Sequence, residues 1–194
     1  MSNLIKVEKI KYELATKDQF LHDFTIKNCM MKFSKIRSSL VAYEQQVPTL
    51  AKVFKEYGHE FIIAYIEYWI DNLNDFINAA RKMSPDQMGE TAILIYQYYP
   101  YLNIADFNLV FTRIKHGEFG KLYESIDGVK ILEYFRTYAS ERANKIEQQN
   151  IGADAQYKQG DYKRHSDTSE IKTAFKQARG FEIIENAKKN KSKK

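Results

Sequence analysis

Cysteine, proline and glycine are scarce in this 194-residue chain, and long apolar runs are absent. The one cysteine, Cys29, has no second cysteine for an internal disulfide, which is typical of a protein in a reducing cytoplasm. Three prolines and eight glycines are too few for the many turns of an all-β fold. No uncharged apolar stretch is long enough to span a membrane, and the charged N-terminus lacks the apolar region of a secretory signal. We therefore expect a helical, cytoplasmic protein without a membrane segment.

Known catalytic motifs are missing as well. The chain has no phosphate-binding glycine loop, no dinucleotide-binding fingerprint, no HExxH and no CxxC pair. Its four histidines lie far apart, and none has a second histidine or cysteine at metal-ligand spacing. Cys29 has no neighbouring base to activate it, so we expect a small buried residue and not a nucleophile. The sequence therefore predicts a non-enzymatic protein with no cofactor and no metal.

The net charge of +5 is distributed unevenly, with an acidic middle and basic ends. Residues 1–37 carry eight basic and four acidic side chains, residues 38–112 carry four and nine, and residues 150–194 carry eleven and six. Such a basic end is typical of a solvated tail, and it can also contact phosphate groups. The last seven residues contain five of the lysines: Lys188, Lys189, Lys191, Lys193 and Lys194.

Apolar residues recur at helical spacing through most of the chain. The strongest series lies between Ile62 and Ala80 and predicts a helix over about 59–82. Thr16 begins a capping-box pattern that predicts a helix over about 17–36. Together with a shorter apolar series after Pro48, these segments indicate a helical core.

Three further helices are predicted from their N-terminal caps. Ser84 ahead of Pro85, Asn103 with Asp106, and Asp127 each match the residues preferred at a helix start. The last of these helices is expected to run to about residue 149. We predict an all-α fold: a compact helical bundle, a short glycine-containing turn or mini-hairpin between the last two core helices, and a flexible basic C-terminal tail.

Composition divides the chain into four predicted parts. Residues 1–37 form a basic N-terminal helical arm, and residues 38–149 form the helical core domain. Residues 150–167 are rich in polar residues and glycine and read as a flexible linker. Residues 168–194 form an amphipathic helix and the Lys-rich tail, and this helix either docks on its own core or engages a partner groove.

Residues 113–123 form the most distinctive polar segment, with basic side chains around two glycines. The glycines fit a tight turn, and the basic side chains could contact nucleic acid as a small wing. The candidate residues for binding nucleic acid or a partner are Arg113, Lys115, Lys121, Tyr123 and the five lysines of the tail.

Two other clusters allow more than one interpretation. The tyrosines at 96, 98, 99 and 101 either pack a helical corner, contact a partner or stack bases. The carboxylates of Glu67, Asp71 and Asp75 follow one another at intervals of four, and form either a solvated acidic face or a surface for a basic partner.

The segment from Asn72 to Arg142 resembles a family of uncharacterised proteins from Bacteroidetes genomes, their phages and mobile elements. The resemblance covers between a third and a half of the chain. It is centred on the pattern Gly117, Phe119-Gly120-Lys121 and Tyr123, followed by Ile126-Asp127-Gly128 and, farther on, Glu141-Arg142. The arrangement of a helical bundle before a C-terminal segment is also similar to that of small phage helicase-loader proteins.

This resemblance implies an accessory role in DNA replication or DNA handling. We therefore expect a phage or mobile-element accessory protein that binds DNA or a replication protein. The alternative is a pure protein–protein interaction module, or a structural protein, with no affinity for nucleic acid. Self-association into a homo-oligomer stays open.

Overall fold

The helical pattern reappears in the structure, a computed structural model that describes residues 9, 12, 16–77, 81–120 and 126–152. The described residues form eight α-helices and no strand longer than an isolated bridge, which confirms the predicted all-α fold class. The helices are α1 (Lys17–Asp23), α2 (Ile26–Lys32), α3 (Ser39–Tyr43), α4 (Leu50–Tyr57), α5 (His59–Phe76), α6 (Pro85–Tyr98), α7 (Ile104–Lys115) and a last one over residues 128–152, called the long helix below.

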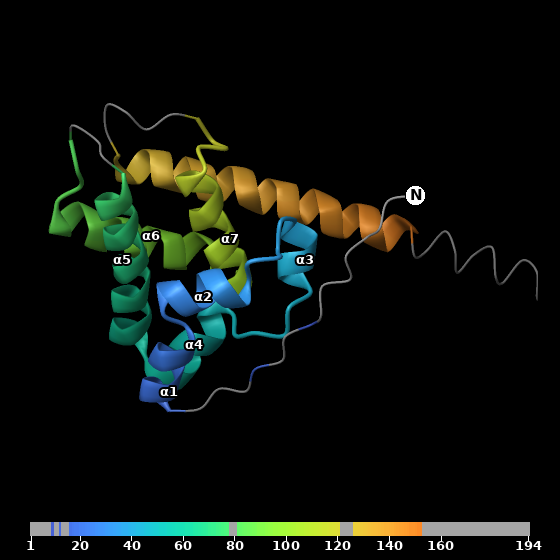
Figure 1. The fold of residues 1–194 in the computed structure, drawn as a ribbon, viewed down its shortest axis with the longest axis horizontal. Coiled ribbons are helices and arrows are strands. Elements are labelled where there is room, and N and C mark those ends of the chain that lie inside the picture. Colours follow the sequence, from blue (N-terminus) through green and yellow to red (C-terminus); the bar gives the residue numbers. More distant parts are fainter. Residues whose placement is uncertain (1–8, 10–11, 13–15, 78–80, 121–125, 153–194) are drawn as a thin grey trace, which may run out of the picture. The chain divides into compact units, whose positions relative to one another are not determined.

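One hydrophobic core connects these helices. It extends from Phe20 of α1 to Tyr138 of the long helix, so the N-terminal helices and the predicted core domain share the same buried cluster. Helix α5 packs against α6, and α7 contacts α2, α3 and α5 (Figure 1). By its internal contacts the chain divides into two units, Met1–Ile146 and Glu147–Lys194. The core described here belongs to the first unit. The predicted amphipathic helix and Lys-rich tail lie outside the described residues.

Helix α7 is the central element of the core. Every residue from Ile104 to Phe111 is buried, which is the pattern of a helix covered on all sides. The indole ring of Trp69 on α5 packs against Phe111 with ring centroids 5.2 Å apart, and Phe107 packs against Phe135 of the long helix at 5.5 Å. Aromatic side chains therefore join α5, α7 and the long helix.

The three predicted helix caps are confirmed. At the start of α6, the Ser84 hydroxyl accepts a hydrogen bond from the Gln87 backbone, and the Gln87 side chain accepts one from the Ser84 backbone. Asn103 and Asp106 form the same reciprocal pair at the start of α7. A carboxylate oxygen of Asp127 accepts from the Lys130 backbone at 2.9 Å and caps the long helix.

The single helix predicted over 17–36 is wrong, because the chain forms two short helices there. Thr25 begins α2 as its cap, with its hydroxyl accepting from the Asn28 backbone at 3.2 Å. The Asn28 amide donates back to the carbonyl of His22 at 2.6 Å and closes the joint. The break allows Phe20 of α1 and Cys29 of α2 to be fully buried in one core.

Helix α5 also ends earlier than the predicted boundary at residue 82. Ile77 leaves the helical conformation directly after Phe76. The buried side chain of Asn74 then holds the returning chain, because its amide donates to the Met83 carbonyl and its oxygen accepts from the Met83 backbone. A polar side chain near the helix end thus replaces the backbone bonds that a longer helix would have made.

A turn follows α7, as predicted. Residues 116–119 form the turn, and both Gly117 and Gly120 have positive φ angles, which favour glycine. The mini-hairpin alternative falls partly on residues 121–125, outside the described residues.

Candidate functional site

Arg113, the first predicted site residue, is held by acidic side chains of its own chain. Two of its guanidinium nitrogens donate to the two carboxylate oxygens of Glu141, at 2.6 and 3.3 Å. Its Nε lies 3.3 Å from Glu118, and the side chain is only 13% exposed. A phosphate group at Arg113 would have to displace these carboxylates.

Glu141 is the centre of this polar cluster. It accepts hydrogen bonds from Arg113, from the Lys145 ammonium group and from the Ser39 hydroxyl at 3.0 Å. Partial burial acts to raise the pKa of Glu141, but these hydrogen bonds and the nearby Arg113 charge outweigh it and lower the pKa to about 2. The cluster connects α3, α7 and the long helix as a charged joint.

Lys115 lies at the edge of an apolar groove. Its ammonium group donates to the Asn72 side chain on α5 and lies 5.2 Å from the ring centroid of Phe76. Burial lowers the pKa of Lys115. The other predicted site residues lie outside the described residues: Lys121, Tyr123, Lys188, Lys189, Lys191, Lys193 and Lys194.

The groove has a volume of about 710 Å³ and is lined by residues from α2, α5 and α7. Four of its five apolar lining residues are large side chains that stay exposed, among them Met31 at 59% and Phe76 at 60% exposure, and the fifth, Ile26, is buried. Single exposed apolar residues are ordinary, but several gathered around one groove are typical of an interaction surface. The lining residues are Ile26, Lys27, Met30, Met31, Tyr68, Asn72, Asp75, Phe76 and Lys115.

The charge at this groove is positive. Its one lining carboxylate, Asp75, is paired with the Lys82 ammonium group at 3.2 Å. Lys27 and Lys115 make no ion pair with any of the described residues. The groove therefore offers apolar area together with two lysine charges that a bound acidic group could meet.

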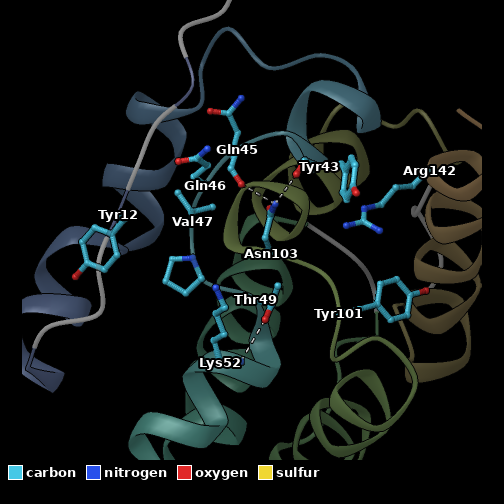
Figure 2. Close-up of a pocket in the computed structure, with 11 residues that line it drawn as sticks. Tyr12, Tyr43, Gln45, Gln46, Val47, Thr49, Lys52, Tyr101, Asn103 and Arg142 are labelled. Carbon is cyan, nitrogen blue, oxygen red and sulfur yellow. Dashed lines mark hydrogen bonds between the residues drawn. The ribbon is translucent and has the colours of Figure 1, made fainter. Parts of the chain in front are cut away.

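A second hollow, the Arg142 pocket, lies where α3, α4, the start of α7 and the long helix meet (Figure 2). Its volume is about 590 Å³. The guanidinium of Arg142 lies between two tyrosine rings, with its carbon 4.7 Å from the centroid of Tyr43 and 5.5 Å from that of Tyr101. Lys52 lies at another part of the wall. Asn103 donates to the backbone carbonyls of Ala42 and Gln45 and fixes the loop that shapes the pocket.

The buried carboxylate of Asp106 is the ion-pair partner of Arg142. It accepts from the Arg142 Nε and from the Tyr138 hydroxyl, the latter at 2.7 Å. Burial raises the pKa of Asp106, while the Arg142 charge and the hydrogen bonds from Tyr138 and Asn103 act against that rise. Asp106 thereby fixes the guanidinium in one orientation.

In the part of the chain that the structure describes, no three His, Cys, Asp or Glu side chains lie close enough together to hold a metal ion. Cys29 is buried, as predicted, and burial raises the pKa of its thiol to about 12 against weaker opposing effects of Tyr65 and Lys32. In the same residues, no helix has the length and apolar character needed to cross a membrane.

Sequence reasoning missed most of the residues at both hollows. Met30 and Met31 lie within the segment predicted as one helix over about 17–36, and nothing in the local pattern indicated that they would be exposed. Arg142 appeared only as part of the family pattern, and Lys52 and Tyr43 carried no signal. The exposed fractions and the pocket depend on which helices pack together, which local spacing does not encode.

Comparison with known proteins identifies one family. Residues 82–178, half of the chain, match the model of a family of unknown function, DUF6633, so the chain belongs to that family. The match includes α6, α7 and Arg142, whereas α1 to α5 precede it. No curated protein and no solved structure matches the chain.

Proposed function

We propose that this DUF6633 member is a non-enzymatic accessory protein that works by binding a protein partner in the groove between α2, α5 and α7. The observation that carries the proposal is the gathering of Met30, Met31, Tyr68 and Phe76, all exposed, around one groove. Large solvent-exposed apolar areas of this kind are retained where another surface covers them. Flexible methionine side chains adapt their shape to a partner, and aromatic side chains supply much of the binding energy.

The partner that fits this groove is an acidic amphipathic helix. Apolar side chains on one face of such a helix would pack on Met31 and Phe76, and its carboxylates would meet Lys27 and Lys115. The pairing of Asp75 with Lys82 leaves the positive charges of the groove in excess. Acidic residues on the partner would therefore speed association, since opposite charges steer the encounter.

Photocrosslinking in the full chain tests the groove. A photoreactive residue replaces Phe76 in one form of the protein and Val129 in another, each produced in cells of the organism that carries the gene. Val129 is the matched control because it is 76% exposed and does not line the groove. We expect one partner protein crosslinked from position 76 and not from position 129. Equal crosslinking from both positions, or none from position 76, would contradict the proposal, and a crosslink to a second copy would identify self-association instead.

A charge reversal tests the acidic character of the partner once it is identified. Lys27→Glu should weaken binding about three- to fivefold at low salt. This corresponds to a loss of binding free energy below about 1 kcal/mol, which is typical of one exposed charge pair. Lys35→Glu is the control, because Lys35 is also exposed but does not line the groove. A partner that binds both variants equally well would contradict an acidic ligand.

DNA binding is a second candidate function, and the five lysines of the C-terminal end favour it. The protein would then act in DNA replication or DNA handling of a phage or mobile element, as the resemblance to Bacteroidetes and helicase-loader proteins implies. Its location would be the cytoplasm. Fluorescence anisotropy with labelled single- and double-stranded DNA compares the wild-type chain with one in which these five lysines are glutamine. Binding that falls steeply with salt and is lost in the glutamine variant is expected if this candidate is correct. Binding that ignores both would exclude the tail as the DNA contact.

A further inference from the structure

The Arg142 pocket combines three properties. A charged side chain is nine-tenths buried at its wall, with only 10% of the Arg142 side chain exposed. A second cation, Lys52, lines the same hollow, and none of the described residues that line it is acidic. The rest of the lining combines apolar and aromatic side chains, among them Val47, Pro48 and the rings of Tyr43 and Tyr101, with uncharged polar ones: Gln45, Gln46, Thr49 and Asn103.

The hydrogen bonds of Arg142 define what the pocket can accept. Among the described residues, Asp106 is its one ion-pair and hydrogen-bond partner, and this pair uses only the Nε nitrogen. The two terminal nitrogens therefore keep their donors for another group. A guanidinium presents these donors as a planar fork that matches a carboxylate or a phosphate in a bidentate manner. Figure 2 shows the guanidinium pointing from the long helix toward Tyr43, on the side of the pocket.

Several other polar groups at the pocket are already engaged within the fold. The Asn103 amide donates to backbone carbonyls, and its oxygen accepts from the Asp106 backbone. The first amides of α4 are also occupied, since Leu50 and Ala51 donate to the carbonyls of Leu102 and Pro100. Asp106 offsets the charge of Arg142, so Lys52 supplies the excess positive charge at the pocket, while Arg142 supplies directed hydrogen-bond donors.

From this arrangement we propose that the Arg142 pocket binds a small organic anion through its phosphate or carboxylate group. The oxyanion accepts from the terminal nitrogens of Arg142 and lies near the ammonium group of Lys52. The organic part of the ligand packs on the apolar wall formed by Val47, Pro48 and Tyr43. A volume of about 590 Å³ exceeds what a bare ion requires and suits a small metabolite or the end of a larger anionic ligand. This site lies apart from the groove of α2, α5 and α7 and does not depend on the function proposed for it.

Calorimetric titration of the full chain with four probes tests the proposal. Inorganic phosphate and phenyl phosphate form one pair, and acetate and benzoate form the other. We expect the aromatic member of at least one pair to bind, and to bind more tightly than its bare ion, because the apolar wall adds contact area. The pair that binds more tightly identifies whether the oxyanion is a phosphate or a carboxylate.

Two variants and one matched control locate the binding. Lys52→Gln should weaken the best probe about three- to fivefold, since Lys52 contributes an exposed charge, whereas Lys55→Gln on the same helix should bind like wild type because Lys55 does not line the pocket. Arg142→Lys keeps the positive charge beside Asp106 but removes the fork, and should weaken binding about tenfold or more. Circular dichroism checks that each variant is folded. Absence of binding by all four probes at millimolar concentration, or equal affinity in Lys52→Gln and Lys55→Gln, would overturn the proposal.

Discussion

At the scale of the residue, Asn103 combines a local and a long-range function. Its side-chain oxygen caps α7, and its amide holds the carbonyl of Ala42 at 2.9 Å across the fold. Loss of a cap costs about 1 kcal/mol, and a buried carbonyl without a donor costs about 1 to 3 kcal/mol more. Asn103→Ala should therefore lower the free energy of unfolding in urea by about 2 to 4 kcal/mol. Asn103→Ser keeps a capping oxygen but lacks the amide that reaches Ala42, so it should recover only about 1 kcal/mol of this loss. A serine variant as stable as the wild type would contradict the long-range contact.

Glu141 predicts how stability changes with pH. Its pKa is about 2 in the folded protein and lies near 4.5 in the unfolded chain, so the unfolded chain binds its proton first as pH falls. The stabilisation from Glu141 is complete above about pH 4.5 and is lost as the pH falls toward 2. Glu141→Gln should flatten this part of the profile of melting temperature against pH. A variant whose profile below pH 4.5 is as steep as that of the wild type would show that Glu141 is not responsible.

At the scale of the element, one glycine controls how closely the long helix approaches α6. A methyl group at Gly128 would lie 2.3 Å from the Thr91 hydroxyl oxygen, which donates to the Gln87 carbonyl at 2.7 Å. Gly128→Ala should therefore destabilise the protein by about 1 to 3 kcal/mol, although alanine usually favours a helix.

A double substitution checks this steric explanation. Thr91→Ala removes the oxygen that an alanine at position 128 would strike, so adding it to Gly128→Ala should recover stability in urea unfolding. Gly152→Ala is the control, because nothing lies within 4 Å of the added methyl group. If the double variant is no more stable than Gly128→Ala, the close approach of the two helices is not the cause.

At the scale of the whole molecule, the N-terminal helices and the rest of the core should unfold together. Phe24 is fully buried in the cluster that also contains Phe135 and Tyr138. Phe24→Ala should lower the free energy of unfolding of the complete helical unit by about 3 to 5 kcal/mol. The fluorescence of the buried Trp69 and the circular dichroism signal should change together in one unfolding transition. Leu21→Ala is the matched control because Leu21 is 44% exposed in the same helix region. Two separate transitions would show that residues 17–36 fold as an independent arm.

The all-α class and most helix starts follow from the sequence alone. Each confirmed cap joins two residues three positions apart: Ser84 with Gln87, Asn103 with Asp106, and Asp127 with Lys130. The apolar spacing that predicts α5 likewise lies within a single helix. These interactions form within a few residues of one another, so their patterns are visible in the sequence. The break at Thr25 was not visible, because a cap inside an apolar run is favoured only by tertiary packing. The early end of α5 was not visible for the same reason, since it depends on the contact between Asn74 and Met83.

Both candidate binding surfaces were decided by the tertiary structure. Tyr43, Tyr101 and Arg142 are far apart in the chain and meet only because α7 lies buried between α3 and the long helix. Arg113, which the sequence indicated as a contact for nucleic acid or a partner, pairs with Glu141 of the same chain. Met31 and Phe76 have the composition of core residues, and only the packing of their helices leaves them exposed. Local spacing determines which residues form a helix, whereas burial and charge pairing depend on neighbours that only the folded chain supplies.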